Sequence, residues 1–182
     1  SFINAGRYAA EEEFFAIQEQ VVVSASKKAQ KISDAPAAIS VITSEDIEKY
    51  DYKTIAEAIS QAPGIYQSTD RSNDYGIFRG IHLSDDNQKR VLVLLNGHTL
   101  NNGMTMECPL GFEIGIPMNA IQRIEVMRGA GSIMYGSNAF FGGINIILKN
   151  KQSNDKDFNR IVLSAGDNQL YTGSVVVNKP KD

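Results

Sequence analysis

The sequence has little that would hold it together covalently or place it in a membrane. Cys108 is its only cysteine, so no internal disulfide can form and the fold must depend on noncovalent packing. The longest aliphatic run, Val91–Leu95, has five residues, whereas a membrane-spanning helix needs about 20. No basic segment followed by an apolar one opens the chain, as a secretory signal would. A cytoplasmic protein and a processed, exported protein both remain open.

Charge argues against one class of partner. The 182 residues include 18 basic and 21 acidic side chains, for a net charge of −3, so no excess of Lys and Arg is available for phosphates. We therefore expect no nucleic-acid partner. With 42% hydrophobic residues, the chain can bury the core of an ordinary globular protein. Its length fits one domain with an appendage, or two very small domains.

The sequence also lacks a catalytic or cofactor-binding constellation. His82, His98 and Cys108 do not have the spacing of zinc ligands, and we interpret the histidines as loop or strand-end residues. Oxygen donors alternate in residues 70–76, as in a calcium loop, but the glycine comes one place late and Ile81 stands where glutamate belongs. No P-loop or nucleophile elbow occurs. We expect no enzyme, no cofactor and no metal site.

Two short helices are predicted after the first clear strand. Residues 38–43 alternate as a strand does, and Thr43 or Ser44 can cap a helix whose first turn is acidic, as the helix dipole favours. A second helix begins with a capping box, Thr54 to Glu57, and residues 63–64, Pro-Gly, should end it. Its apolar face consists of Ile55, Ala58, Ile59 and Ala62.

Short strands and long loops fill the rest of the chain. The expected strands are residues 77–81, 90–97, 123–128 and 144–149, with long loops at 67–76 and 99–112 and a short helix beginning at Pro117. This order indicates an α+β fold, a small mixed β-sheet with short helices and long loops. A hairpin is predicted at 161–177. We divide the chain into an N-terminal segment at 1–30, a main domain at 31–150, and a spacer with the hairpin at 151–182.

Strand directions predict where the two longest loops lie. If residues 77–81 and 90–97 pair as a hairpin, their other ends point the same way. Loops 67–76 and 99–112 then share one end of the domain.

Glycines are concentrated around the last strand of the main domain. Residues 123–150 contain Gly129, Gly131, Gly136, Gly142 and Gly143, which either make turns or let backbone pack directly against backbone. One turn of helix fits residues 132–135. In the strand that follows, one face carries Ile144, Ile146 and Leu148. We expect this face to meet the core, against Val126, Val93, Ile55 and Ile59.

Six segments of the sequence, taken in order, resemble one family. They are "VVVSA", "APAAISVITSEDIEKY", "IAEAISQAPGI", "IFRGI", "VLVLLNGHTLN" and "IPMNAIQRIEVMRGAGSIMYGSNAFFGGINIILK". Together they are similar to the plug domain of TonB-dependent outer-membrane receptors over about residues 19–149. The chain departs from the family pattern at Phe78, Asn96 and Ala130, where Ile, Asp and Pro are common. Asn96 thereby loses a charge, which puts any role of that charge in doubt.

The resemblance implies a location and a task. The plug of such a receptor sits inside a large β-barrel in the bacterial outer membrane and blocks its lumen. It helps to bind a scarce nutrient, such as a ferric siderophore, haem or cobalamin. The energy-transducing protein TonB then pulls on its N-terminal segment from the periplasm. Residues 161–177 would be the first hairpin of that barrel, whose remainder is absent from this chain.

The resemblance also assigns roles to residues. The TonB-binding box would be Glu19, Gln20, Val21, Val22, Val23, Ser24 and Ala25, an extended segment that adds a strand to the C-terminal domain of TonB. Arg79 and Arg128 would form a latch with carboxylates of the barrel wall. The substrate-facing loops would contribute Arg71, Asn73, Asp74, Tyr75, Asn102, Met104, Met106 and Phe112. For each of these residues, an ordinary solvated surface position is the alternative.

A protein of another class remains as a second hypothesis. A free-standing periplasmic or secreted ligand-binding module could have the same plug-like fold. The parent gene beyond residue 182 distinguishes the two, because many alternating strands of about ten residues indicate the importer, whereas a nearby stop codon indicates the module.

Overall fold

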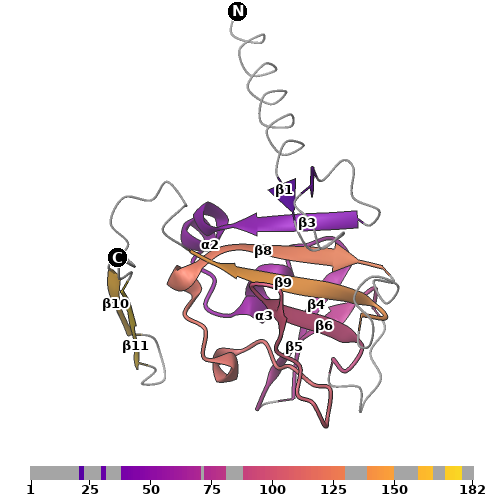
Figure 1. Cartoon of the computed structure of the whole chain (residues 1–182). Coiled ribbons are helices and arrows are strands. Elements are labelled where there is room, and N and C mark those ends of the chain that lie inside the picture. The colour runs from indigo at the N-terminus through magenta and orange to yellow at the C-terminus, as the bar shows by residue number, and fades with distance from the viewer. Residues whose placement is uncertain are drawn as a thin grey trace, which may run out of the picture.

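The computed structural model of the chain shows a small mixed β-sheet with short helices beside it and a separate two-stranded hairpin near the C-terminus (Figure 1). This architecture confirms the α+β prediction. The structure describes residues 21–22, 30–31, 38–70, 72–80, 88–129, 139–149, 160–165 and 171–177.

The described residues form the following elements. The strands are β1 (Val21–Val22), β2 (Gln30–Lys31), β3 (Ala38–Thr43), β4 (Ile65–Thr69), β5 (Asp74–Phe78), β6 (Val91–Leu95), β7 (His98–Thr99), β8 (Ile121–Arg128), β9 (Gly142–Leu148), β10 (Arg160–Ala165) and β11 (Tyr171–Val176). The α-helices are α2 (Ser44–Tyr50) and α3 (Ile55–Ile59), and the 3-10 helices are η2 (Phe112–Ile114) and η3 (Met118–Ala120). The short helix expected from Pro117 is thus the 3-10 helix η3.

The main sheet has the order β3-β8-β9-β6-β7. β9 lies in its middle (Figure 1) and pairs antiparallel with β8 and parallel with β6. A strand with neighbours on both edges is covered by the sheet interior, and the first five residues of β9 are buried. β9 therefore connects the two halves of the sheet.

The core lies on the face of the sheet that α3 covers. Ile144 and Ile146 are fully buried in one cluster with Val126 and Val93, and with the α3 residues Ile55 and Ile59. This contact set confirms the predicted face of the last strand, with Leu148 partly buried at its margin. Burying such aliphatic side chains stabilises the fold by roughly 1.5–3 kcal/mol each.

The capping interactions at the starts of α2 and α3 agree with the sequence prediction to different extents. Thr43 caps α2 through a complete capping box, because its Oγ1 accepts from Asp46 N at 3.1 Å and its N–H donates to Asp46 Oδ2 at 2.9 Å. Thr54 caps α3, accepting from Glu57 N at 3.2 Å. The predicted box at α3 is only half formed, however, because the Glu57 carboxylate accepts from Lys53 N at 2.7 Å rather than from Thr54 N. α3 also ends at Ile59, before the expected stop at Pro-Gly.

The prediction for residues 67–76 was wrong, since they are mostly strand rather than loop. β4 and β5 pair antiparallel as a separate hairpin, with Thr69 opposite Asp74. The predicted pairing of 77–81 with 90–97 was also wrong, because β6 pairs with β9 and β7 instead. β6 is buried on both faces, and the interior of the larger sheet provides that burial, whereas a two-stranded hairpin does not.

Gly142 and Gly143 make close backbone contacts rather than turns, because both lie within β9. A Cβ on Gly142 would lie 2.7 Å from Cε1 of Phe78 and also against the backbone oxygen of Met127. The missing side chain thus makes room for the Phe78 ring. Gly129 has φ +122°, a conformation that favours glycine. Gly131, Gly136 and the predicted helical turn at 132–135 lie outside the described residues.

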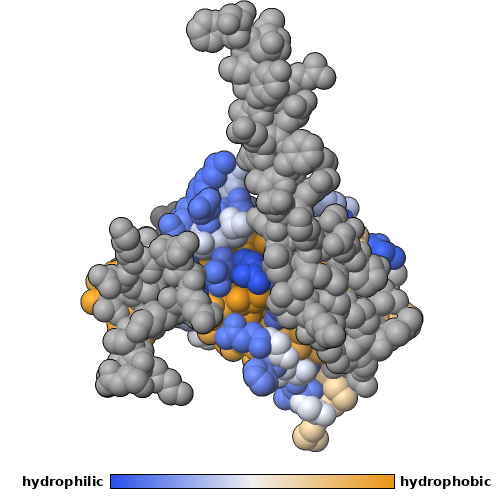
Figure 2. All heavy atoms as spheres, turned by 45° about the horizontal axis from the view of Figure 1, so that its top comes forward, coloured by the Kyte–Doolittle hydropathy of each residue, from blue (hydrophilic) through white to orange (hydrophobic). Residues whose placement is uncertain are grey.

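The C-terminal hairpin is present as predicted. β10 and β11 pair antiparallel, with Ile161 opposite Val175 and Ala165 opposite Tyr171. Its predicted turn at 166–168 lies outside the described residues. Apolar side chains on one face are exposed, including Leu163 at 82%. Figure 2 views the molecule from another direction. On its coloured surface, apolar residues are visible between hydrophilic ones.

Gly142→Ala tests the close contact at β9. We expect a loss of about 1–3 kcal/mol in the free energy of unfolding, because the added methyl group must displace Phe78 or the Met127 backbone. Urea denaturation followed by circular dichroism measures it. Gly103→Ala is the matched control, since nothing lies within 4 Å of its Cβ position, and its effect should stay within about 0.5 kcal/mol. Equal effects of the two substitutions would contradict this packing.

Candidate functional site

The two segments expected to share one end of the domain do meet, although by a different strand pairing. Leu110 N donates to Asp74 O at 2.7 Å, and Asp74 N donates to Glu113 Oε1 at 3.2 Å. The β4–β5 turn and the 99–112 loop therefore form one surface, here called the loop end. Its described members from the predicted set are Asn73, Asp74, Tyr75, Asn102, Met104, Met106 and Phe112.

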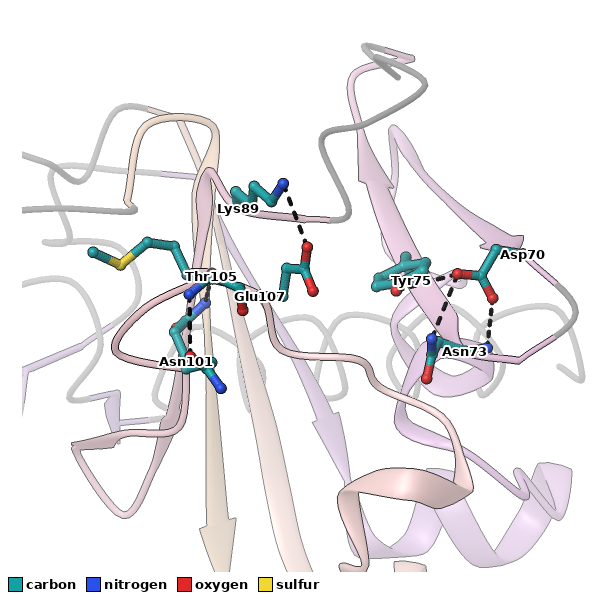
Figure 3. A network of polar contacts seen from close by, with 9 residues as sticks. Asp70, Asn73, Tyr75, Lys89, Asn101, Thr105 and Glu107 are labelled. Atoms are coloured by element: carbon teal, nitrogen blue, oxygen red, sulfur yellow. Dashed lines mark hydrogen bonds and ion pairs between the residues drawn. The ribbon is translucent and has the colours of Figure 1, made fainter.

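The turn between β4 and β5 is closed by a carboxylate. Asp70 Oδ1 accepts from Ser72 N at 2.9 Å and from Asn73 N at 2.7 Å. Figure 3 shows the bond to Asn73. These two backbone bonds stabilise the ionised form and hold the pKa of Asp70 below its usual range. The residue that resembled the start of a calcium loop is thus used to build the turn. Arg71 lies outside the described residues.

Tyr75 is placed differently from its neighbours in the predicted set. It is only 5% exposed, and its hydroxyl donates to Asp70 Oδ2 at 3.4 Å (Figure 3). Burial, followed by the negative charge of Asp70, raises the pKa of the phenol. Tyr75 therefore supports the turn from beneath, and its contact with a ligand stays a prediction.

Asn101 fixes the start of the 99–112 loop along the edge of β6. Its Oδ1 accepts from Val93 N at 2.8 Å, and its Nδ2 donates to Val91 O and to Met106 O, both at 3.0 Å. The side-chain amide replaces a neighbouring strand at this position. This role of Asn101 was not predicted, because an asparagine in a polar loop belongs to no sequence pattern that indicates such a contact.

Asn102 organises the tip of the same loop. Its Oδ1 accepts from Met104 N at 2.8 Å and from Thr105 N at 3.1 Å, and its backbone bonds to Glu107 and Met106 close the loop. Met104 is 94% exposed at this tip, and Phe112 is 56% exposed nearby along the chain. The loop thus presents apolar side chains to the surroundings from an ordered backbone.

Two further side chains help to hold the loop end together. Lys89 Nζ and Glu107 Oε1 form an ion pair at 3.4 Å (Figure 3), a partly exposed contact worth about 0–1 kcal/mol. Gln88 is 6% exposed, and its Oε1 accepts from Gly76 N at 2.8 Å on the edge of β5. The role of Gln88 was not predicted either, since Gln88 follows a polar stretch without the alternation of a strand.

The two predicted latch arginines both contact the turn that follows α3. Arg128 Nη1 donates to Pro63 O at 3.1 Å, and Arg79 N donates to Gly64 O at 2.7 Å. Arg79 is exposed and has a left-handed backbone, φ 55°. Among the described residues, neither guanidinium has an ion-pair partner. Both are therefore available for a carboxylate from elsewhere.

Asn96, which stands where the family commonly has aspartate, makes two hydrogen bonds to β9. Its Oδ1 accepts from Leu148 N at 3.0 Å, and its own N–H donates to Ile146 O at 2.8 Å. Its φ of 49° is left-handed, a conformation that Asn tolerates well. A neutral amide oxygen is sufficient for this backbone contact, so the structural role of the position survives the loss of charge.

A buried polar group spans β8 and β9. Glu125 is fully buried and opposite Asn145 in the ladder. Arg123 Nε donates to Glu125 Oε1 at 2.9 Å, and Asn145 Nδ2 donates to Glu125 Oε2 at 3.4 Å. Charge-assisted bonds of this kind offset the cost of burying a carboxylate. The alternation of strand residues gave no sign of this polar group, because it predicts a face and not a partner.

Of the three residues that could supply zinc ligands, the structure describes Cys108 and His98. Cys108 is 5% exposed, His98 is exposed in β7, and His82 lies outside the described residues. Burial, with a smaller contribution from Glu113, raises the pKa of the Cys108 thiol to about 11. The described residues contain no group of three or more His, Cys, Asp or Glu side chains arranged to hold a metal ion.

A cavity of about 560 Å³ lies between the main domain and the C-terminal hairpin. Residues from 47–54 and 111–119 contribute most of its lining, and Val162, Gly173 and Ser174 contribute the part from the hairpin. Asn119 Nδ2 donates to Ser174 Oγ at 3.1 Å across this junction. Among the predicted site residues that the structure describes, Phe112 alone lines this cavity.

Only part of the predicted TonB-binding box is described. Val21 and Val22 form β1, which pairs antiparallel with Gln30 and Lys31 of β2. The other five residues of the box lie outside the described residues. Where the chain is described, none of its helices has the length and apolar character that a membrane crossing requires.

Comparison with known proteins gives a consistent result. A family model described as the TonB-dependent receptor plug domain matches residues 31–143. The iron-regulated outer membrane virulence protein of Vibrio cholerae is 37% identical over 139 residues, which cover 74% of this chain and 20% of that protein. The vitamin B12 transporter BtuB of Photobacterium profundum is 32% identical over 127 residues, 70% of this chain and 20% of that protein.

Solved structures agree at the level of the fold. The ferripyoverdine receptor of the outer membrane of Pseudomonas aeruginosa has a TM-score of 0.65 at 19% identity, covering 86% of this chain and 19% of that one. The siderophore receptor PiuA of Acinetobacter baumannii has a TM-score of 0.58 at 22% identity, covering 87% and 21%. The chain spans about a fifth of the length of the curated relatives that it matches.

Asp70 makes the loop end sensitive to acid. Because its folded pKa lies below the usual value of 3.8, its contribution to stability is present above that value and is lost as pH falls through the depressed pKa. We expect Ser72 and Asn73 amides to lose hydrogen-exchange protection in that range, measured by NMR. Asp70→Asn keeps the acceptor oxygen without the titration, so its turn should not open. An identical acid response in that variant would contradict the assignment.

Cys108 should be unreactive in the folded protein. Raising its pKa from 9.0 to about 11 lowers the thiolate fraction near pH 8 about a hundredfold, and burial restricts access further. Iodoacetamide should therefore label Cys108 slowly in buffer and rapidly in urea, as followed by mass spectrometry. Rapid labelling of the folded chain would show that the thiol is not in this environment.

Proposed function

Because the chain belongs to the plug-domain family of TonB-dependent receptors, we propose that it is the gate of an outer-membrane receptor that actively imports a scarce nutrient. The observation that carries this proposal is the family match over residues 31–143, most of the described domain. Relatives of this family are receptors and transporters rather than enzymes, and we propose no catalytic step and no cofactor.

Two kinds of nutrient are supported by the relatives. One relative is named for iron regulation and another for vitamin B12 transport, and structural neighbours include siderophore receptors. We propose a ferric siderophore, haem or cobalamin as the ligand class. The described loop end would contribute Asp74, Asn102, Met104 and Phe112 to its recognition, and Asn73 and Tyr75 would shape the turn beside it.

The relatives are outer-membrane proteins, which supports the same location for this one. In the proposed arrangement the domain occupies the lumen of a barrel formed by the rest of the receptor. The exposed apolar face of β10–β11 supports this, because the lipid-facing side of a membrane barrel strand alternates apolar residues in this way. The hairpin would then be the first of that barrel.

Arg79 and Arg128 are proposed as the latch between plug and barrel. Neither guanidinium has an ion-pair partner among the described residues, and arginine binds carboxylates through paired N–H donors. A partly exposed pair contributes only about 0–1 kcal/mol. Such a contact holds orientation without preventing the plug from moving.

TonB is proposed as the periplasmic partner, bound through residues 19–25. The described part of this box, Val21 and Val22, is extended in β1, the conformation that strand addition requires. The alternative of a free-standing periplasmic or secreted binding module is not favoured, because the curated relatives of this chain are receptors of which it covers about a fifth.

Val22→Pro tests the proposed function. Proline removes the backbone N–H and the strand ladder at that residue, so a pull-down with the C-terminal domain of TonB should lose the complex. Val22→Ala keeps the backbone donor and should retain binding within about threefold, since main-chain bonds provide most of the affinity in this mode.

Two results of this pull-down contradict the proposal. If the unaltered chain does not bind the TonB domain, the gate of a TonB-driven importer is the wrong function. If Val22→Pro binds as well as the unaltered chain, the box is not at residues 19–25.

A further inference from the structure

A series of hydrogen bonds leads from the loop end to Arg79, which follows β5, and to Arg128 at the end of β8. It begins at Leu110, which is fully buried and whose N–H donates to Asp74 O at 2.7 Å. The carbonyl of the same residue accepts from Ala56 N in α3 at 3.1 Å. Leu110 therefore connects the β4–β5 hairpin to α3 through both of its peptide groups.

α3 is closely packed in the core. Ala56, Ala58 and Ile59 are fully buried, and Ile55 is nearly so. A Cβ on Gly76 would lie 2.7 Å from Cδ1 of Ile59, which shows how closely β5 approaches the helix. Because close-packed interiors have little free volume, a displacement at Leu110 cannot be absorbed within this short helix.

The turn after α3 receives both arginines. Ala62 N donates to Ile59 O at 2.9 Å, which joins the turn to the helix. Pro63 O then accepts from Arg128 Nη1 at 3.1 Å, and Gly64 O accepts from Arg79 N at 2.7 Å. Consecutive carbonyl groups thus bond to the residue that follows β5 and to the last residue of β8.

Arg128 depends strongly on this turn. Its Nε is buried without a hydrogen-bond partner among the described residues, and its Nη1 donates to Pro63 O. Arg79 Nη2 lies 3.6 Å from the position of a Cβ on Gly129, the residue after Arg128. A shift of the turn would therefore move the Arg128 guanidinium and the backbone of Arg79 together.

We propose that the Pro63–Gly64 turn is the positioning element for Arg79 and Arg128, and that α3 couples this turn to Leu110 and hence to the loop end. This proposal rests on the proposed function, in which the loop end contacts the ligand and the two arginines contact the barrel. Ligand contact at the loop end would then reorient the latch. Coupling between sites is reciprocal, so a change at the turn must also alter the stability of the hydrogen bonds at Leu110.

Gly64→Ala, made in the 182-residue chain, tests this coupling. Gly64 has φ +77° and open space at its Cβ position, so alanine strains only the backbone of the turn. Gly97→Ala is the matched control, because Gly97 has φ +85° and the same open surroundings in the β6–β7 turn. The measurement is native-state amide exchange by NMR, with each rate divided by that of Ile144 in β9 to remove differences in global stability.

The coupling predicts a selective response. Relative to the control, Gly64→Ala should accelerate exchange of the Leu110 and Ala56 amides by about fivefold or more, the lower end of usual coupling between sites. A smaller difference would overturn the proposal. If Gly64→Ala does not fold, Gly64→Asn replaces it under the same criterion, since Asn tolerates a positive φ better than alanine.

The complete receptor distinguishes failure of this inference from failure of the proposed function. Uptake and surface binding of radiolabelled ferric siderophore, haem and cobalamin are measured for the unaltered receptor, Gly64→Ala and Gly97→Ala. We expect Gly64→Ala, and not Gly97→Ala, to change surface binding and to reduce uptake, because reciprocal coupling carries the change at the turn to the loop end. Normal uptake by Gly64→Ala would overturn the coupling. No uptake of any of the three by the unaltered receptor would instead contradict the importer itself.

Discussion

The fold depends on how closely β9 approaches its surroundings at Gly142 and Gly143. These residues have no side chains, so the Phe78 ring can lie against the strand and β9 can pair with β8 and β6 at once. From that position Ile144 and Ile146 extend into the core beneath α3. A methyl group at Gly142 would occupy the space that Phe78 uses. A side chain at Gly142 would therefore disturb both the position of Phe78 and the pairing of β9 with β8.

The loop end is attached to this core by polar groups rather than by a larger sheet. The β4–β5 hairpin has no strand neighbour beyond itself among the described residues. Instead, Gln88 and Leu110 occupy the free edge of β5, and Asn101 occupies the edge of β6. Such side-chain and single-residue contacts satisfy backbone groups without lengthening the sheet. This arrangement presents polar and apolar loop residues from an ordered base, which suits recognition of a ligand.

Local patterns predicted the elements whose causes are local. Thr43 precedes an acidic first turn and caps α2, and alternation predicted the buried face of β9 with Ile144 and Ile146. The β4–β5 hairpin was missed because most β4 side chains are polar and exposed, and its turn depends on Asp70. The partner of β6 was wrong because an apolar strand fits any interior position, and its pairing with β9 joins residues about 50 positions apart. The residues of the site were assigned by resemblance, whereas the supporting roles of Asn101 and Gln88 follow only from three-dimensional contacts.

Hydrogen exchange across the main sheet tests the central claim most directly. If β9 joins the two halves of the sheet through its close contacts, amides of Val126 and Ile144 should exchange only by global unfolding, with one common free energy. The β4–β5 hairpin should open at lower free energy, because fewer groups hold it. Exchange of β9 amides by local opening, at rates like those of β4 and β5, would contradict the account.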